Sequence, residues 1–173
     1  IIHSDPERRA VVVSAPAGVT NMLIAWVTPY GTPDLHPDIE KIHKIYASPD
    51  DIIHAVERIF SQINADLGAD LNIEDIFKKH VEKCHELRQH GSSEYYHYAV
   101  HIGERVNAQL AAVAWDFEYA EPSFIRFDQN GRFDWNATKA AAEDIGLKSW
   151  AESGIVIPGF YGLKPDNTVW TFS

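Results

Sequence analysis

Short apolar runs alternate along the chain with longer segments whose apolar residues recur every three or four positions. Residues 10–13 are apolar and β-branched, which predicts a buried strand. Residues 154–158 and 168–172 predict two further strands, and residues 124–127 are a strand candidate ahead of a turn. Because helical patterns separate these runs, the sequence predicts an α/β protein with a layered sheet.

The middle of the chain, residues 38–115, reads as nearly all helix. Its clearest start is Ser48-Pro49-Asp50-Asp51, with a capping residue, proline at the first helical position and acids in the first turn. Further helices are predicted over residues 72–89 and over residues 93–115, the second with Gly103 inside it. Since a glycine within a helix costs about 1 kcal/mol relative to alanine, we expect a packing reason for it. The remaining helices are predicted at residues 20–27, 39–46 and 136–145.

Length and composition limit the kinds of function that this protein can have. The chain has 173 residues, which fits one domain or a large piece of one, and its 45% hydrophobic content predicts a real core. No apolar run approaches the ~20 residues of a membrane-spanning helix. The net charge of −10 argues against binding to nucleic acid or to an anionic membrane, since phosphate neutralisation needs clustered Lys and Arg. The single cysteine, Cys84, excludes an internal disulfide and, with no secretory signal evident, predicts a cytoplasmic location.

The segment "VVVSAPAGVTN", residues 11–21, joins the first predicted strand to the first predicted helix. Thr20 or Asn21 is the candidate cap of that helix. A strand that ends in a turn with Ser and Gly, just before a helix start, directs hydroxyls and backbone N–H groups at one spot, which favours an anion. Many α/β proteins have such turns, so a purely structural role explains this segment equally well.

Three blocks of the chain together resemble the aspartate kinases of the amino-acid kinase superfamily. "VVVSAPAGVTN" is similar to the family's second conserved block, and "HIGERVNAQLAA", residues 101–112, resembles its Gly-Glu helix. "GIVIPGFYGLKPDNTVWTFS", residues 154–173, resembles the strand-hairpin-strand segment that leads into the family's Arg-Gly-Gly-Ser-Asp motif. The order and spacing of the blocks also agree. The resemblance implies a three-layer α/β/α sandwich of the amino-acid kinase (carbamate kinase-like) type, here incomplete.

Two further motifs of that family are not in the sequence. The Lys-Phe-Gly-Gly phosphate-binding motif would precede Ile1, and the Arg-Gly-Gly-Ser-Asp motif would follow Ser173. Ile1-Ile2 reads like the end of a helix and residues 167–173 like an interrupted strand, so we expect an excised piece. Residues 1–173 are expected to be the substrate-binding part of an amino-acid kinase domain, without its nucleotide-binding half or regulatory domains, and inactive alone.

The family's reaction transfers the γ-phosphoryl group of ATP to the side-chain carboxylate of L-aspartate, and four residues match its substrate site. Thr20 would hold the substrate with its hydroxyl and the helix N-terminus, and Ser14 would line the same turn. Glu104 would accept hydrogen bonds from the substrate ammonium, which selects amino acids over plain dicarboxylates. Phe160 would wall the pocket. The structural alternatives are a helix cap for Thr20, a solvated helix position for Glu104 and a core position for Phe160.

The resemblance also implies cofactors and partners for the complete protein. These are ATP, with Mg²⁺ to screen its phosphates, and L-aspartate, in a protein expected to form a homo-oligomer. The product would be 4-phospho-L-aspartate, in the first step of lysine, threonine and methionine biosynthesis. The arginine expected to bind the α-carboxylate belongs to the motif after Ser173. No catalytic residue and no metal ligand is assigned within the chain.

Other interpretations stay open beside this one. Further superfamily members phosphorylate glutamate, acetylglutamate, carbamate or a nucleotide, and the helical middle could instead be a binding or oligomerisation surface of an inactive fragment. His80, Cys84 and His85 suggest a zinc site, but no fourth ligand is evident, and Cys84 on an apolar face is more simply a core residue. A Ser-His-Asp hydrolase is unsupported, because Ser14 lacks the Gly-x-Ser-x-Gly elbow.

Overall fold

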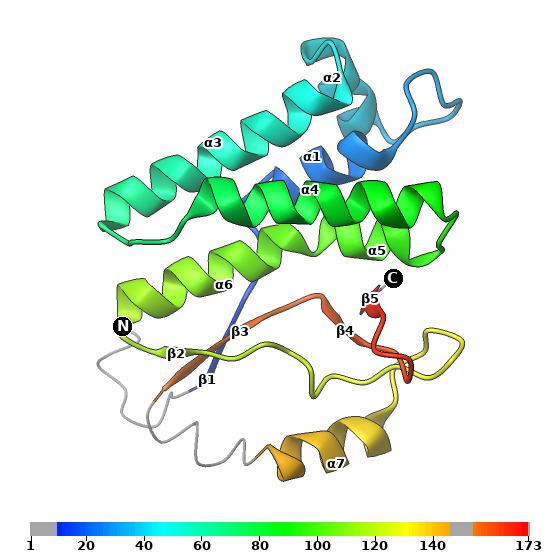
Figure 1. Ribbon diagram of the computed structural model, residues 1–173. Coiled ribbons are helices and arrows are strands. Elements are labelled where there is room, and N and C mark those ends of the chain that lie inside the picture. The colour runs from blue at the N-terminus through cyan, green and yellow to red at the C-terminus, as the bar shows by residue number, and fades with distance from the viewer. Residues whose placement is uncertain (1–9, 146–153, 173) are drawn as a thin grey trace. The chain divides into compact units, whose positions relative to one another are not determined.

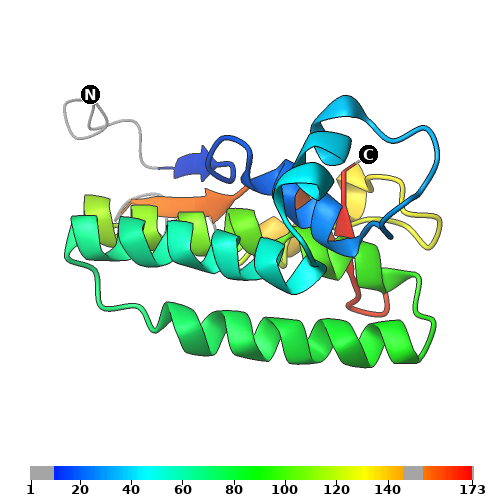
Figure 2. The same ribbon diagram turned by 90° about the horizontal axis from the view of Figure 1, so that it is seen from above.

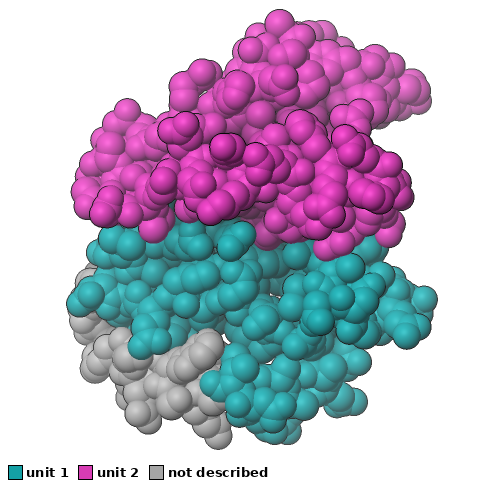
Figure 3. Space-filling view, in the orientation of Figure 1, with its two compact units in different colours: residues 1–14, 104–173 teal, residues 15–103 magenta. Residues whose placement is uncertain are grey.

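The structure is a computed structural model that describes residues 10–145 and 154–172. The chain divides into two compact units, which Figure 3 shows in different colours. Unit 1 comprises residues 1–14 and 104–173, and unit 2 comprises residues 15–103. The boundary between residues 103 and 104 falls inside helix α6 (Ile102–Trp115). Each unit has a core of its own, built from different elements.

A parallel three-stranded sheet lies at the centre of unit 1 (Figure 1). Its middle strand is β3 (Ile155–Pro158), with β1 (Ala10–Val13) on one side and β2 (Glu118–Tyr119) on the other. β1 and β3 pair along their whole lengths, so the two strands end side by side. All of β3 is buried, as expected for the central strand of a parallel sheet that is covered on both faces.

Successive residues of β3 face opposite sides of the sheet and pack against different helices. Ile155 and Ile157 share a buried cluster with two alanines of α7 (Trp135–Asp144). Val156 shares another cluster with two alanines of α6. Figure 1 accordingly shows α6 and α7 on opposite faces of the sheet. The predicted three-layer α/β/α architecture is confirmed.

Unit 1 also contains an antiparallel hairpin of β4 (Tyr161–Leu163) and β5 (Val169–Thr171). A turn at residues 164–168 joins the two strands. Asn167 has a left-handed backbone with φ 63°, and its N–H donates to the C=O of Lys164 at 2.9 Å. This φ suits Asn, which adopts the left-handed conformation more readily than most residues.

The predicted strand at residues 124–127 is wrong. Arg126 makes only an isolated bridge to Leu163, and its N–H donates to the hydroxyl of Thr138 (2.9 Å) on α7. The N–H of Phe127 donates to the C=O of Leu163 and the N–H of Leu163 to the C=O of Ile125, both at 2.9 Å, so the segment meets β4 at a single bridge and forms no continuous strand. The third strand of the parallel sheet is instead β2, which the sequence pattern did not predict.

Unit 2 is helical, and its core forms where amphipathic helices pack on one another. α3 and α4 run antiparallel side by side (Figures 1 and 2), and the rings of Phe60 and Phe77 lie 5.9 Å apart between them. The predicted helix start at Ser48 is confirmed, because its hydroxyl accepts the N–H of Asp51 (3.2 Å). No helix in the described parts of the chain has the length and apolar character needed to span a membrane. The helices of the unit are α1 (Val19–Val27), α2 (Pro37–Ile45), α3 (Pro49–Leu67), α4 (Ile73–Gln89) and α5 (Glu94–Val100).

Two helix predictions in this unit need correction. Neither Thr20 nor Asn21 caps α1, because the cap is Gly18, with φ 83°, and the helix already starts at Val19. The single helix predicted at residues 93–115 is two helices, α5 and α6, with His101 between them.

The break between α5 and α6 has a local cause. Nδ1 of His101 hydrogen-bonds the C=O of Tyr98 at 2.5 Å, which places a side chain in the backbone hydrogen-bond ladder. The expected packing reason for the glycine that follows is confirmed. A Cβ at Gly103 would lie 3.0 Å from the Cβ of Ala15 and 3.2 Å from a methyl of Leu23. An alanine here would require these neighbours to move by a few tenths of an ångström, so the packing favours glycine.

Candidate substrate-binding site

The carboxyl ends of β1 and β3 bring two of the predicted site residues next to each other. Ser14 follows β1, and Gly159-Phe160 follows β3. The N–H of Gly159 donates to the C=O of Val13 at 2.8 Å. A Cβ on that glycine would lie 3.9 Å from the hydroxyl oxygen of Ser14. Ligands of open parallel sheets bind outside the carboxyl ends of the strands, and this edge of the sheet is therefore the candidate site.

The first turns of α6 reach the same edge. Nδ2 of Asn107 donates to the C=O of Ser14 at 2.6 Å, and Asn107 lies one helical turn after Glu104. Glu104 is 3% exposed and sits in the first turn of α6, where the helix dipole favours a negative charge. Carboxylates are rarely buried to this degree unless other groups compensate their charge, and such groups concentrate at functional sites. The solvated alternative for Glu104 is therefore wrong.

Phe160 has a backbone conformation that bulky side chains seldom adopt. Its φ is 75°, in the left-handed region, and its side chain is half-buried rather than in the core. The N–H of Phe172 donates to its C=O at 2.8 Å and helps hold it there. A strained backbone of this kind costs about 1–3 kcal/mol and persists only where the surroundings impose it, commonly at functional sites. The conformation favours a functional role for Phe160.

Thr20 lies in the other unit. It is the second residue of α1 and is half-buried. Unit 1 thus supplies Ser14, Glu104 and Phe160 from one end of its sheet, whereas Thr20 belongs to unit 2. The substrate-binding role of all four residues stays a prediction.

A polar network that the sequence did not indicate lies next to these residues in unit 1. Both carboxylate oxygens of Glu121 are engaged, one by the hydroxyl of Tyr161 (2.7 Å) and the other by the hydroxyl of Tyr119 (2.6 Å). Nε of Arg105 lies 3.6 Å from the second oxygen. Burial raises the pKa of the Tyr161 hydroxyl well above its usual range, and the neighbouring Tyr119 and Glu121 add to the effect. No sequence motif joins these residues, since Glu121 and Tyr161 are 40 positions apart.

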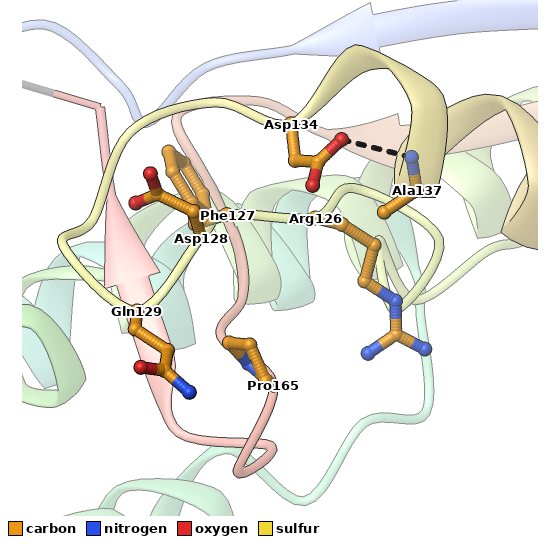
Figure 4. A pocket seen from close by; sticks show the side chains of 7 residues that line it. All are labelled: Arg126, Phe127, Asp128, Gln129, Asp134, Ala137 and Pro165. Atoms are coloured by element: carbon orange, nitrogen blue, oxygen red, sulfur yellow. Dashed lines mark hydrogen bonds between the residues drawn. The ribbon is translucent and has the colours of Figure 1, made fainter.

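A surface cavity of about 390 Å³ in unit 1 is not part of this site. Figure 4 shows Asp134 at its edge, where the carboxylate accepts the N–H of Ala137 (2.9 Å) and caps α7. The carboxylate of Asp128 accepts the N–H groups of Asn130 and Arg132, each at 2.8 Å. Both acids therefore close local turns. The cavity is lined by Arg126, Phe127, Asp128, Gln129, Asp134, Ala137 and Pro165, which include none of the four candidate residues.

The zinc alternative finds no support in the described residues. Sγ of Cys84 lies 3.6 Å from Nε2 of His80, but His85 is exposed on the same helix. Burial raises the pKa of the Cys84 thiol to about 12, which opposes the thiolate form that metals bind. Across residues 10–145 and 154–172, no three His, Cys, Asp or Glu side chains are placed to hold a metal ion.

Comparisons with known proteins agree with this architecture. No protein-family model matches the sequence, and no curated protein matches it either. Solved structures do match, and they include the aspartate kinase of Clostridium acetobutylicum, with 25% identity and a TM-score of 0.71. E. coli aspartokinase III in complex with aspartate and ADP (R-state) matches with 21% identity and a TM-score of 0.72. The same enzyme in complex with lysine and aspartate (T-state) matches with 20% identity and a TM-score of 0.68.

These matches cover almost all of the chain but only part of each enzyme. They span 98–99% of the 173 residues and 36–38% of the matched chains. The resemblance stated from the motifs is thus confirmed by an independent comparison of backbones. The chain has the fold of the aspartate kinases, over slightly more than a third of the length of those enzymes.

Proposed function

We propose that the chain is the amino-acid-binding part of an aspartate kinase. The complete protein would transfer the γ-phosphoryl group of ATP to the side-chain carboxylate of L-aspartate, in the first step of lysine, threonine and methionine biosynthesis. The observation that carries the proposal is the arrangement at one end of the sheet in unit 1. Ser14, the strained Phe160 and the buried Glu104 lie there, in a chain that has the aspartate kinase fold.

Each residue has a chemical role in this proposal. Glu104 accepts hydrogen bonds from the substrate ammonium, an interaction that would compensate its buried charge. The hydroxyl of Ser14 lies beside the strand ends and binds a substrate oxygen. Phe160 forms an apolar wall, and Thr20 acts from the N-terminus of α1. In such a reaction the nucleophile belongs to the substrate, so the protein mainly orients the reactants.

We place the nucleotide and Mg²⁺ on residues of the complete protein other than those described here. No group of acidic, His or Cys side chains in the described part of this chain fits a metal ion. Bound Mg²⁺ would neutralise the phosphates of ATP. The complete protein is proposed to be a cytoplasmic homo-oligomer, and the buried free thiol of Cys84 suits such a reducing compartment.

The test is calorimetric titration of L-aspartate into the chain and into Glu104→Gln, with succinate as the control ligand. Gln keeps the shape of Glu104 but removes the charge that meets the ammonium, so we expect about tenfold weaker aspartate binding or more. Glu143→Gln, an exposed position on α7, is the matched control and should bind as the unmodified chain does. Succinate, which has no ammonium, should bind neither protein measurably.

If the chain shows no binding of L-aspartate, the test is made on the complete protein. There, aspartate-dependent release of ADP from ATP is measured with and without Glu104→Gln. Activity that is indifferent to this substitution, or that prefers glutamate, acetylglutamate or carbamate, would assign another substrate. Absence of kinase activity in the complete protein would favour a binding or oligomerisation role.

A further inference from the structure

The side chain of Glu121 connects two segments that each carry a candidate substrate-binding residue. Its carboxylate accepts the hydroxyl of Tyr161 at 2.7 Å and lies 3.6 Å from Nε of Arg105. Tyr161 directly follows Phe160, and Arg105 directly follows Glu104. A hydrogen bond from a tyrosine to an ionised acceptor is among the stronger ones in proteins. One carboxylate therefore links the start of β4 to the first turn of α6.

The strained backbone of Phe160 depends on anchors on both of its sides. On the N-terminal side, Gly159 donates to the C=O of Val13 at 2.8 Å. The C=O of Phe160 accepts the N–H of Phe172 at 2.8 Å. The next side chain, Tyr161, is 2% exposed and reaches Glu121 through its hydroxyl. Because a left-handed φ of 75° is disfavoured for Phe, loss of one anchor frees the backbone to relax.

We propose that Glu121 is a positioning residue that, through Tyr161 and Arg105, holds Phe160 in its left-handed conformation and sets the position of Glu104. It acts through the neighbour of each candidate residue. The inference rests on the proposed function only in assigning aspartate as the ligand of Phe160 and Glu104. The geometric part, the effect of Glu121 on the backbone of Phe160, stands separately.

The test compares graded variants by NMR spectroscopy of the isotopically labelled chain. Glu121→Gln retains one acceptor oxygen, Glu121→Ala removes both, and Tyr161→Phe removes only the hydroxyl while keeping the ring. Backbone chemical shifts and the φ-sensitive coupling of Phe160, with the amide shift of Glu104, are the readouts. We expect changes that grow from Glu121→Gln to Glu121→Ala and that Tyr161→Phe reproduces, with none in the exposed control Glu143→Gln.

Aspartate titration of the same proteins provides the functional arm. Tyr161→Phe should weaken binding about fivefold, the effect of one lost hydrogen bond transmitted to the site. Glu121→Gln should recover part of the affinity that Glu121→Ala loses. A purely structural role of the carboxylate would lower the unfolding midpoint without this graded recovery and without moving the φ-sensitive signals of Phe160.

The outcomes separate this inference from the proposed function. Unchanged Phe160 and Glu104 signals in a folded Glu121→Ala protein would overturn the positioning role. If Glu121→Ala does not fold, Tyr161→Phe decides by the same signals. Graded shifts together with no aspartate binding in the chain or in the complete protein would refute the aspartate site and leave the positioning role intact. Aspartate binding that none of the variants alters, together with unchanged Phe160 signals, would support the aspartate site and overturn the positioning role of Glu121.

Discussion

The two units of the chain are organised by contacts of different range. In unit 2, consecutive helices pack on one another (α1 with α2, α3 with α4, and α4 with α5), although α1 also packs on α3 and α5. In unit 1, β1 pairs with β3, and Ala10 lies opposite Ile155. Local contacts cost little chain entropy, whereas pairing of distant strands requires most of the chain to be ordered first. The positions of Ser14, Glu104 and Phe160 in unit 1 therefore depend on contacts between segments that are distant in sequence.

The units also bury polar groups in different ways. In unit 2, His80 and His101 are 2% and 3% exposed, and each hydrogen-bonds a backbone carbonyl of α5. His80 additionally stacks on Tyr98, with ring centroids 4.9 Å apart. In unit 1, Glu121 accepts a hydrogen bond from Tyr161, which is 40 positions away, as well as from its near neighbour Tyr119. His101 makes a local contact, His80 connects α4 to α5, and the carboxylate of Glu121 reaches across 40 positions to Tyr161.

The largest expected effect tests whether the units unfold separately. Phe60→Ala removes a fully buried ring that packs on Phe77, and we expect it to lower the free energy of unfolding by about 4 kcal/mol. Hydrogen exchange should accelerate at the amides of α3 and α4 more than at those of β3. Phe60→Leu, which keeps most of the volume, should cost about 1.5 kcal/mol. Equal acceleration in α3 and β3 would show that the chain unfolds as one cooperative unit.

Two glycines, one in each unit, give a matched pair of intermediate effects. A Cβ at Gly162 of β4 would lie 2.5 Å from the backbone oxygen of Ile125, so Gly162→Ala should cost about 3 kcal/mol. At Gly103 the nearest contact of an added Cβ would be the Cβ of Ala15 at 3.0 Å. The higher helix propensity of alanine stabilises the helix by about 1 kcal/mol and offsets part of the cost of this contact. Gly103→Ala should therefore cost about 1 kcal/mol or less. Thermal unfolding checks the order, and a larger loss at Gly103 would contradict it.

Alkaline pH should weaken the two units over different ranges. Burial raises the pKa of the Cys84 thiol from 9.0 to about 12, and burial also raises that of the Tyr161 hydroxyl from 10.0. Each group holds its proton longer in the folded state, so its contribution to stability is complete below the unfolded pKa and is lost as pH rises. Unit 2 should lose about 1.4 kcal/mol per pH unit from about pH 9, and unit 1 from about pH 10.

Urea unfolding between pH 8 and pH 11 measures this dependence. Cys84→Ala should flatten the part that begins near pH 9. Tyr161→Phe should reduce, without abolishing, the slope that begins near pH 10, because burial also raises the pKa of Tyr119 in unit 1 and of Tyr95 and Tyr96 in unit 2. An unchanged slope in both variants would mean that neither group governs the alkaline response.

The smallest expected effects concern one helix cap in each unit. Ser48 caps α3 through the N–H of Asp51 (3.2 Å), and Asp134 caps α7 through the N–H of Ala137 (2.9 Å). Replacing either residue by alanine should lower the free energy of unfolding by about 1 kcal/mol, and Asp134→Asn should restore most of that loss. Chemical denaturation provides the measurement. A cap in one unit that costs nothing would show that its helix end is held by tertiary packing.

Several features were predictable because the physical cause lies within a few residues. The start of α3 follows from Ser48-Pro49 and the acids after them, and the turn at Asn167 follows from its residue types. The apolar run of β3 predicted a buried strand correctly. The run at residues 10–13 does form a strand, β1, but its burial was predicted wrongly, because its residues are exposed or half-buried and Val12 is 65% exposed. The three quoted blocks indicated the aspartate kinase fold, because they retain the order and spacing of the family.

Other features failed or were missed because a distant partner decides them. The segment at residues 124–127 meets β4 only at a bridge to Leu163, and the N–H of Arg126 donates to the hydroxyl of Thr138 on α7. β2 is too short for a periodic signal and exists only because β3 pairs with it. The contacts of Glu121 have no sequence signature at all.

The sequence by itself indicated most helices of unit 2, the buried strand β3 of unit 1 and, through the family resemblance, the four residues proposed to bind substrate, because periodicity, capping and motif spacing are local properties. Tertiary structure alone decided that β3 lies between β1 and β2, which sets Ser14 beside Gly159. It also decided that Glu104 is buried and that Phe160 adopts φ 75°. These outcomes depend on contacts between segments up to 145 positions apart, such as Ala10 with Ile155, and such contacts form only when the whole sheet is assembled.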